Sequence, residues 1–504
     1  MDTLIFVQAL ILLSPIFLYI YLQIKNYNST TRYGFTSYPI VGTVPEFVLN
    51  CHRFLDWTAE VLIRTPSHTG ILDRPGKIKV FLTANPANVE HMVKTNFDNY
   101  PKGTRFISLL EELLGNGIFN AEGESWRLQR KISSYEFNTR SLRNFVMEAA
   151  NVELQDRLIP ILERASDINR VFDLQDVFER YTFDSICKVA FNFDPCCLSG
   201  DGTNNSEFMS AFEEATTLIT QRFIRLCPGD QKIRKFFKLK SEMKLEKAIA
   251  TVHKFADDII KKRMDERDGK TDEDLLSRFM GHSDYSPKFL RDIVVSFILA
   301  GRDTTSSALS WFFWLLSSHP EVERKILDEL RSIRRKTGKS SSESYCFDDM
   351  RHMHYLHGAL SEGLRLYPPV PLETKDSLKD DVMPDGTFIG KGWFVTYNAY
   401  AMARIESVWG KDCCEFRPER WLEEDECGNV VYRPESPFKF PAFHGGPRIC
   451  VGKEMAYTQM KLVAATIIEK FRVEVLAENK NPPQHVLALT IRMKDGLKVR
   501  VWKR

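Results

Sequence analysis

The chain has 504 residues, of which 43% are hydrophobic and 12% aromatic, so it can bury a large core. Its formal net charge of +2 is close to neutral, which argues against nucleic acid as a partner. The ten cysteines show neither a C-x-x-C nor a Cys/His spacing, so we expect no zinc site and no disulfide framework, and hence a reducing compartment.

The N-terminal segment is apolar. Residues 4–22 contain no charged side chain and, at about 1.5 Å per residue, are long enough to cross a bilayer. The segment lacks the basic start and the cleavage site of a signal peptide. Asp2 precedes it while Lys25 and Arg32 follow it, and this asymmetry favours a cytosolic catalytic part. We therefore predict a single-pass transmembrane anchor over 1–24, a polar linker over 25–36 and one catalytic domain over 37–504.

Most of the remaining chain reads as helix. A β-type run over 77–82 comes first, and from about residue 88 to 370 apolar residues recur at three- and four-residue spacing. Short strand-like runs return after residue 380, for example over 392–397. The pattern predicts a mainly α fold with a small β-rich portion.

A polar hexapeptide, Ala-Gly-Arg-Asp-Thr-Thr, interrupts the longest apolar helical stretch, residues 289–316. Glycine within a helix costs about 1 kcal/mol relative to alanine, so the hexapeptide is a poor choice for stability. Buried threonine hydroxyls can bond back to the preceding turn and open a local kink. Either the hexapeptide merely bends the helix, or Asp303 and Thr304 serve chemistry at its middle.

The most informative segment places Cys450 at the end of the glycine-rich loop Phe-His-Gly-Gly-Pro-Arg-Ile-Cys-Val-Gly. Gly446 and Gly452 let the backbone curl and aim N–H groups at the sulfur, which suits a thiolate that ligates haem iron. Phe443 can shield the sulfur from water, and Arg448 can pair with a haem propionate. An ordinary buried cysteine in a turn would not need these accessories.

This loop matches the Phe-x-x-Gly-x-Arg-x-Cys-x-Gly signature of the cytochromes P450, which the whole chain resembles. A finer similarity, to the plant P450 family 94, lies in residues 298–306, 364–371 and 446–456. One departure is His444, where many relatives of that family have Gln. The resemblance implies the cytochrome P450 fold with an N-terminal transmembrane anchor.

The resemblance also implies roles for individual residues. Cys450 would be the axial ligand of the iron of haem b, and Asp303 and Thr304 would deliver protons for O–O cleavage. The implied haem-binding residues are Cys450, Arg448, Phe443, Gly446, Gly452, Trp126, Arg130 and Lys375.

Three charged residues resemble the family's structural ion-pair triad. Glu362 and Arg365 stand at i, i+3, a pair worth little on an exposed helix, and Arg420 follows in the chain. By resemblance they lock the region behind the haem, so their role would be folding and haem retention.

The resemblance implies an electron supply and a location as well. No flavin or nicotinamide motif is present, so electrons would come from NADPH through a separate NADPH–cytochrome P450 reductase. Arg127, Lys131, Arg140 and Arg143 form either its electropositive docking face or an ordinary solvated helix face. The expected location is the endoplasmic reticulum membrane, with the catalytic domain facing the cytosol.

Family resemblance implies hydroxylation of a lipid at or near a terminal carbon, through restraint of the chain end. The substrates it leaves open are a long-chain fatty acid at its ω-carbon, a sterol or steroidal intermediate at C-26, and, behind both, a jasmonoyl–amino acid conjugate. Glu373 and the pair Glu111-Glu112 offer no clamp for a carboxylate, which favours a neutral sterol, but Arg105 or Arg222 could serve as one.

Two other functional classes stay open at this point. Haem-thiolate enzymes that rearrange hydroperoxides without oxygen or a reductase share the fold, but they typically lose the Asp-Thr pair. A haem sensor without enzymatic activity would not need the hydroxyl of Thr304.

Overall fold

The computed structural model describes residues 34–38, 41–74, 78–138, 140–200, 206–224, 231–265, 274–281, 286–476 and 482–504. The predicted anchor over 1–24 and most of the predicted linker lie outside these residues. Within them, no helix has both the length and the apolar character that crossing a membrane requires.

The described chain is mainly α-helical, as the apolar spacing predicted. The helices are α2 (Val44–Asn50), α3 (Phe54–Arg64), α4 (Pro86–Glu90), α5 (Thr104–Leu114), α6 (Gly123–Asn138), α7 (Arg140–Glu153), α8 (Ile159–Asp167), α9 (Leu174–Phe191), α10 (Glu207–Ile224), α11 (Gln231–Phe236), α12 (Lys240–Asp265), α13 (Leu275–Met280), α14 (Pro287–Ser317), α15 (Pro320–Thr337), α16 (Phe347–Arg351), α17 (His354–Leu366), α18 (Ala399–Met402), α19 (Glu406–Trp409) and α20 (Lys453–Lys470).

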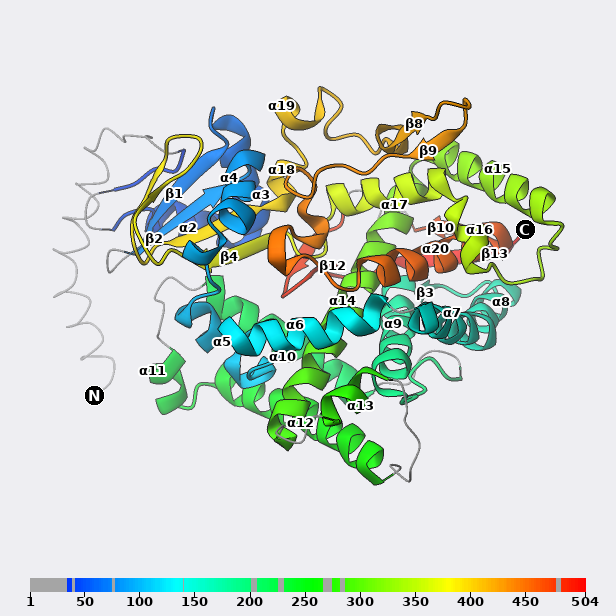
Figure 1. Cartoon of the computed structure of the whole chain (residues 1–504), viewed down its shortest axis with the longest axis horizontal. Helices are drawn as coiled ribbons and strands as arrows, with labels where there is room; N and C mark the ends of the chain where they lie inside the picture. The colour runs from blue at the N-terminus through cyan, green and yellow to red at the C-terminus, as the bar shows by residue number, and fades with distance from the viewer. Residues whose placement is uncertain are drawn as a thin grey trace, which may run out of the picture.

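The β-rich portion is small and divided among short sheets. Its strands are β1 (Thr69–Arg74), β2 (Ile78–Thr83), β3 (Phe172–Asp173), β4 (Leu372–Asp376), β5 (Asp381–Val382), β6 (Phe388–Ile389), β7 (Phe394–Asn398), β8 (Leu422–Glu424), β9 (Val430–Tyr432), β10 (Phe471–Val475), β11 (His485–Leu487), β12 (Ile491–Met493) and β13 (Lys498–Lys503). The largest sheet has the order β1-β2-β7-β4, and β2 and β7 pair in parallel. It lies at one end of the molecule beside α2 and α3 (Figure 1).

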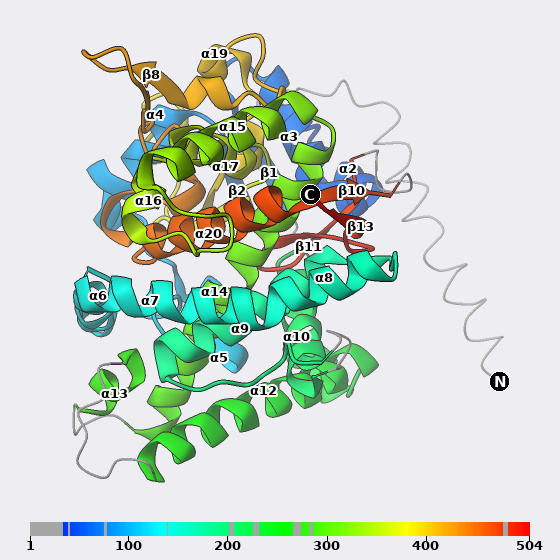
Figure 2. The same cartoon turned by 90° about the vertical axis from the view of Figure 1, so that its right-hand side faces the viewer.

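Helix α14 forms the centre of the fold. Ser286 caps it by accepting a hydrogen bond from the Phe289 N–H at 3.2 Å, Pro287 occupies its first turn, and Pro320 starts the next helix. Most of its 31 residues are buried because other helices cover it on several sides. Figure 2 shows α14 between a layer containing α12 and α13 and a second layer containing α15, α17 and α20.

The segment that contains the glycine-rich loop leads into α20. Two short 3₁₀ turns, Pro441–Phe443 and Gly446–Arg448, fold the loop back on itself before the helix starts at Lys453. Helix α20 is buried along most of its length and packs against α14, so the loop is held against the middle of the molecule.

Candidate functional site

A largely apolar cavity of about 310 Å³ lies between α14 and the glycine-rich loop. Cys450 lines it from the loop, and Ala300, Gly301 and Thr304 line it from α14. Helices α5 and α6, strand β4 and the segments before β4 and β12 also contribute to the wall. We call it the central cavity.

The sulfur of Cys450 is placed by backbone hydrogen bonds. The N–H of Cys450 donates to the carbonyl oxygen of Phe443 at 2.9 Å, which closes the loop. Burial raises the pKa of the Cys450 thiol, while the backbone N–H of Gly452 and the charges of Arg130 and Lys453 oppose this rise. The expected N–H group at the sulfur is therefore present, at Gly452.

Of the three glycines of the loop, Gly446 and Gly452 were predicted to shape it, and their surroundings differ. Gly446 has a φ of 64°, and an added Cβ would lie 1.9 Å from the backbone oxygen of Val93, so no side chain fits. Gly452 has no such constraint, because its added Cβ would lie 4.0 Å from the Cys450 sulfur, at ordinary contact distance. Phe443 lines the cavity with its ring 5.2 Å from that of Tyr457.

Cationic side chains gather on one side of the central cavity. Arg448 donates to a carboxylate oxygen of Glu122 at 2.8 Å and stacks over the Trp126 ring, with 4.4 Å from the guanidinium carbon to the ring centroid. Arg130 lines the same wall, and among the described residues its guanidinium makes no hydrogen bond and no ion pair. Burial lowers the pKa of both arginines. An anion in the cavity would therefore stabilise them.

Lys375 adds a buried charge on the same side. Its Nζ lies 3.3 Å from Oε1 of Glu373, and Lys102 Nζ binds the same oxygen at 2.5 Å. Burial and the neighbouring Lys102 lower the pKa of Lys375 to about 8. Burial alone would raise the pKa of Glu373, but the two lysines outweigh it and lower that pKa. Two lysines share one carboxylate, which leaves positive charge at the cavity wall.

His444, the residue that departs from the family pattern, is held within the loop. Its backbone has a φ of 58°, and its Nδ1 lies 2.5 Å from the hydroxyl oxygen of Tyr397 on β7. Burial lowers the pKa of His444 to about 4, so the ring is neutral at physiological pH. It therefore adds a hydrogen bond to this wall and no charge.

These residues fit haem. The half-buried guanidinium of Arg130 and three further cations, Arg448, Lys375 and Lys102, line the cavity. The thiol of Cys450 and the small residues Ala300 and Gly301 line it too. Haem would bring two propionates to the cations and iron to the sulfur. Arg130, Arg448, Lys375 and Trp126 are the expected propionate-side residues, and the structure brings all four to one wall.

The hexapeptide in α14 splits between two sides of the helix. Thr304 lines the cavity, and its hydroxyl donates to the carbonyl oxygen of Ala300 at 2.6 Å, as expected for a buried threonine. The helix nevertheless continues unbroken from Pro287 to Ser317, so the expected kink is not an interruption. Gly301 is needed for close packing, because an added Cβ would lie 2.4 Å from the side chain of Ile186 on α9.

Asp303 does not line the central cavity. Its carboxylate accepts from Arg302 at 2.7 Å and lines a separate small polar pocket with Glu179, Glu213 and Arg492. Burial raises the pKa of Asp303, and it raises that of Glu179 to about 7. The structure therefore places the two predicted proton-relay residues on different sides of one helix.

A second cavity of about 380 Å³ adjoins the first. Phe106, Leu372 and Leu489 line both. The sheet of β1, β2, β4 and β7 forms one side of it, and α5 and the end of α10 form the other. Lining residues of these two cavities come from the segments 106–119, 212–223, 297–305, 369–374 and 486–491, among others.

The predicted ion-pair triad is present and deeply buried. The Glu362 carboxylate accepts two hydrogen bonds from Arg365, both at 2.8 Å, and one from Arg420 at 3.2 Å. It also accepts from the Trp421 ring nitrogen at 2.8 Å and from the backbone N–H of Arg417 at 3.1 Å. Arg365 in turn binds three backbone carbonyl oxygens. The triad joins α17 to the segment around Trp421 and touches neither cavity.

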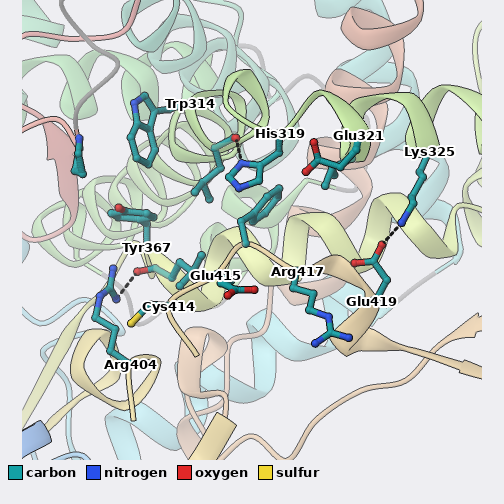
Figure 3. A pocket seen from close by; sticks show the side chains of 15 residues that line it. Trp314, His319, Glu321, Lys325, Tyr367, Arg404, Cys414, Glu415, Arg417 and Glu419 are labelled. Atoms are coloured by element: carbon teal, nitrogen blue, oxygen red, sulfur yellow. Dashed lines mark hydrogen bonds and ion pairs between the residues drawn. The ribbon is translucent and has the colours of Figure 1, made fainter. Parts of the chain in front are cut away.

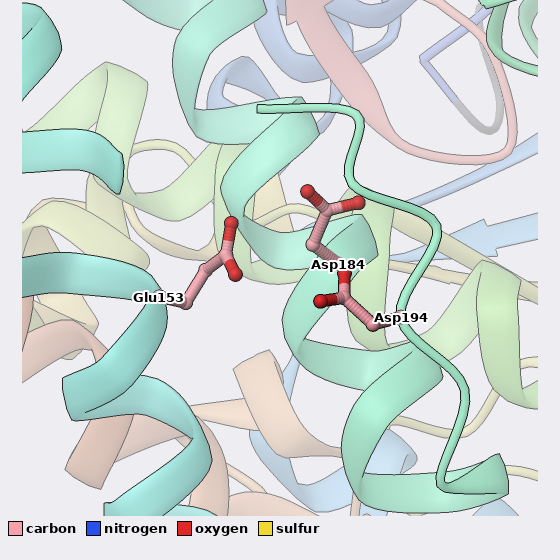
Figure 4. A group of neighbouring side chains, drawn as sticks. All are labelled: Glu153, Asp184 and Asp194. Carbon is pink, nitrogen blue, oxygen red and sulfur yellow. The ribbon is translucent and has the colours of Figure 1, made fainter. Parts of the chain in front are cut away.

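Two other features resemble sites, but ion pairs within them already engage charged side chains. A pocket of about 660 Å³ between α15 and the 414–419 segment shares no lining residue with the central cavity, and its Lys325 and Glu419 pair with each other at 2.5 Å (Figure 3). Glu153, Asp184 and Asp194 form a carboxylate cluster (Figure 4). Arg157 pairs with all three, so a cation already occupies their centre.

Comparisons with known proteins agree with this geometry. Residues 34–499 match the sequence model of the family described as Cytochrome P450. Cytochrome P450 CYP94D108 of Paris polyphylla is 49% identical to this chain, with 91% of this chain and 90% of the relative covered. Cytochrome P450 94A1 of Vicia sativa is 44% identical, with 93% of this chain and 90% of the relative covered. Cytochrome P450 94B1 of Arabidopsis thaliana is 45% identical, with 93% of this chain and 91% of the relative covered.

Proposed function

Because the chain belongs to the cytochrome P450 superfamily and, within it, to family 94, we propose that this monooxygenase hydroxylates a terminal or near-terminal carbon of a lipid. The proposed target is either the ω-carbon of a long-chain fatty acid or the C-26 side-chain carbon of a sterol or steroidal intermediate, with further oxidation of the same carbon included. A jasmonoyl–amino acid conjugate is the alternative substrate.

One observation carries the proposal: a single apolar cavity joins the sulfur of Cys450, the hydroxyl of Thr304 and a second apolar cavity. A lipid chain that enters from the second cavity has its end directed to the space between Cys450 and α14. A primary C–H bond is harder to break than its secondary neighbours, so terminal attack depends on this positioning.

The residues of the central cavity have separate tasks in the proposal. Haem b, when bound, supplies the activation of dioxygen and the insertion of one oxygen atom into a C–H bond, for which a thiolate ligand is favourable. Cys450 holds the iron, and Arg130 and Arg448 bind propionates. Phe443 keeps water from the sulfur.

Thr304 presents a hydroxyl to the cavity, where it accepts and passes on a proton at Oγ1. Asp303 contributes from another side of α14, where burial raises its pKa and raises that of Glu179 to about 7, so that Glu179 exchanges a proton near neutral pH. A proton path between the two sides requires a rearrangement around Arg302, which now pairs with both Asp303 and Glu179.

The proposed electron supply is NADPH through a separate NADPH–cytochrome P450 reductase. Arg127 and Lys131 lie exposed on α6 and do not line the central cavity, which supports a docking role for them. The proposed location is the endoplasmic reticulum membrane, with residues 1–24 as the anchor and the catalytic domain in the cytosol.

The test uses microsomes that contain the full chain and a plant reductase. A long-chain fatty acid, a 22-hydroxylated cholesterol and a jasmonoyl–amino acid conjugate are each supplied with NADPH, and new oxygen is located by mass spectrometry. Oxygen at the chain end of any of them supports the proposal and selects the substrate. The absence of all three products despite an intact carbon-monoxide difference spectrum contradicts it, and NADPH-independent conversion of a lipid hydroperoxide would establish the rearrangement class instead.

A further inference from the structure

The second cavity is apolar except for arginines and hydroxyls. Arg74 at the end of β1, Arg105 on α5 and Arg222 on α10 line it together with Thr374 and Thr396. None of the described residues that line it is an Asp or a Glu. Its charge is therefore unlike that of a cavity built only to hold a hydrocarbon.

Arg222 is already neutralised by acids outside the cavity. It binds Glu242 at 2.5 Å, and a second nitrogen lies 3.4 Å from Glu112. This arrangement makes Arg222 a structural residue. Of the two arginines that the sequence suggested for binding a substrate carboxylate, Arg105 therefore remains.

Arg105 keeps its charge available to the cavity. Its guanidinium carbon lies 4.3 Å from the centroid of the Phe394 ring. Within the described chain the guanidinium group makes no hydrogen bond and no ion pair, and only the backbone oxygen of Arg105 accepts a side-chain hydrogen bond, from Ser108. The acid that acts on it electrostatically, Asp376, forms no ion pair with it, and burial raises the pKa of that acid to about 6. Arg105 is thus held by stacking on an aromatic face, with its N–H groups uncommitted.

Arg74 stands close enough to Arg105 for the two charges to repel each other. Its guanidinium contacts the carbonyl oxygen of Phe223 at 3.5 Å and lies 5.2 Å from the centroid of the Phe47 ring. The pKa of both arginines is lowered to about 10, by burial for Arg105 and by burial together with the neighbouring Arg105 for Arg74. Both remain charged at neutral pH, so an anion between them would relieve burial and repulsion together.

We propose that Arg105, assisted by Arg74, binds the carboxylate of the lipid substrate in the second cavity while the other end of the substrate reaches the central cavity. The inference rests on the proposed function and deepens it, because it favours a lipid carboxylate over a neutral sterol. Phe106 follows Arg105 on α5 and lines both cavities, so a chain anchored at Arg105 passes directly into the central cavity. A free fatty acid and an amino-acid conjugate both provide this chemistry.

The anchor also explains how a terminal carbon would be selected. A carboxylate held in one cavity fixes how far along the chain the substrate reaches into the other. Without the anchor, an apolar chain can slide, and several carbons near its end can meet the reacting site. Arg105 is therefore a specificity-determining residue in this proposal, and it does not take part in the chemistry.

The test compares dodecanoic acid with dodecanol, which has the same chain without the charge. Dissociation constants are measured from the substrate-induced change in the haem spectrum of the full-length enzyme, for the wild type, Arg105→Gln, Arg105→Lys and Arg74→Gln. Arg64→Gln, which removes an exposed charge on α3, is the matched control. The carbon-monoxide spectrum confirms that each variant holds haem as the wild type does.

The expected result is that Arg105→Gln weakens binding of the acid by about tenfold or more and leaves binding of the alcohol unchanged, since a hydrogen bond to a charged partner is lost. Arg105→Lys should retain part of the affinity, Arg74→Gln should weaken acid binding less, and the control should change nothing. Products of the Arg105→Gln variant should be spread over the last few carbons.

Equal weakening of acid and alcohol would show that Arg105 only packs the cavity, and unchanged acid binding in Arg105→Gln would overturn the proposal. A jasmonoyl–amino acid conjugate is titrated in parallel, and the ligand whose affinity depends more on Arg105 identifies the source of the carboxylate. If the wild type oxygenates a lipid terminus but the dissociation constant of the acid does not change in Arg105→Gln, this inference fails and the proposed function stands. If no lipid is oxygenated, the proposed function fails.

Discussion

The buried triad gives the sharpest stability prediction. Replacing Glu362 with alanine leaves the Arg365 guanidinium in a fully buried position with its charge unbalanced. It also removes the acceptor of the Trp421 ring nitrogen and one of the acceptors of Arg420, which keeps Asp412. Removing one partner of a buried ion pair typically costs about 3–5 kcal/mol. Because the Glu362 carboxylate accepts five hydrogen bonds, we expect the upper part of this range.

The assay is a urea titration of the full-length protein in detergent, followed through the carbon-monoxide difference band. Glu423→Ala is the matched control, because Glu423 pairs with Arg433 at 3.7 Å and both side chains are more than half exposed. Such an exposed pair is worth about 0–1 kcal/mol. A loss of less than about 1 kcal/mol for Glu362→Ala, equal to the control, would refute the claim that the triad holds the fold together.

Three further results are expected. Thr304→Ala should retain the haem spectrum but lower the product formed per NADPH by about tenfold or more, with the difference appearing as peroxide. Ser310→Ala is the control, because it removes the same kind of helix hydroxyl away from the cavity and should not change the product formed per NADPH. Gly446→Ala should abolish haem binding, because the added Cβ clashes with the backbone oxygen of Val93. Gly428→Ala, at a similar positive φ but with open space around it, should retain the carbon-monoxide band. Equal haem binding by the two variants would show that the clash is not decisive. Burial raises the pKa of Glu179 from 4.5 to about 7, so the folded protein holds a proton that the unfolded chain releases, and stability should fall as pH rises through that window. Glu179→Gln should flatten this dependence in denaturant titrations at several pH values, and an unchanged slope would contradict the assignment.

Much of the site could be predicted because its signals are local. The glycine-rich loop contains Cys450, Phe443 and Arg448 within a few residues, and the structure places all three on one cavity wall. The long apolar run around Thr304 is likewise a single helix. Patterns of this kind are confined to one element, so the sequence displays them directly.

The side of α14 on which Asp303 lies follows from helix geometry. Successive residues point about 100° apart around a helix, so neighbours in the sequence need not line the same cavity. Thr304 and Thr305 line the central cavity, whereas Asp303 lines the polar pocket beside it. Packing of α9 and the ion pair with Arg302 then hold Asp303 away from the central cavity. Because Asp303 and Thr304 are adjacent in the sequence, a shared role was predicted for them, and the sequence alone did not indicate that they line different pockets.

Contacts between distant segments left no trace in the sequence. Lys102 and Glu373 are 271 positions apart, and neither belongs to a recognisable pattern, yet they form a buried ion pair at the central cavity. Arg222 seemed available as a clamp because its partners, Glu242 and Glu112, come from other helices. Such pairings depend on how the helices pack, which periodicity alone does not specify.

The most direct test of the account is the carbon-monoxide difference spectrum of the full-length protein and two cysteine variants. The wild type and Cys427→Ala, which changes an exposed cysteine in the turn between β8 and β9, should both show the band of a thiolate-ligated haem. Cys450→Ala should lose that band, because the sulfur that faces the central cavity is gone. A thiolate-type band that persists in Cys450→Ala would contradict the assignment of Cys450 and, with it, the proposed mechanism.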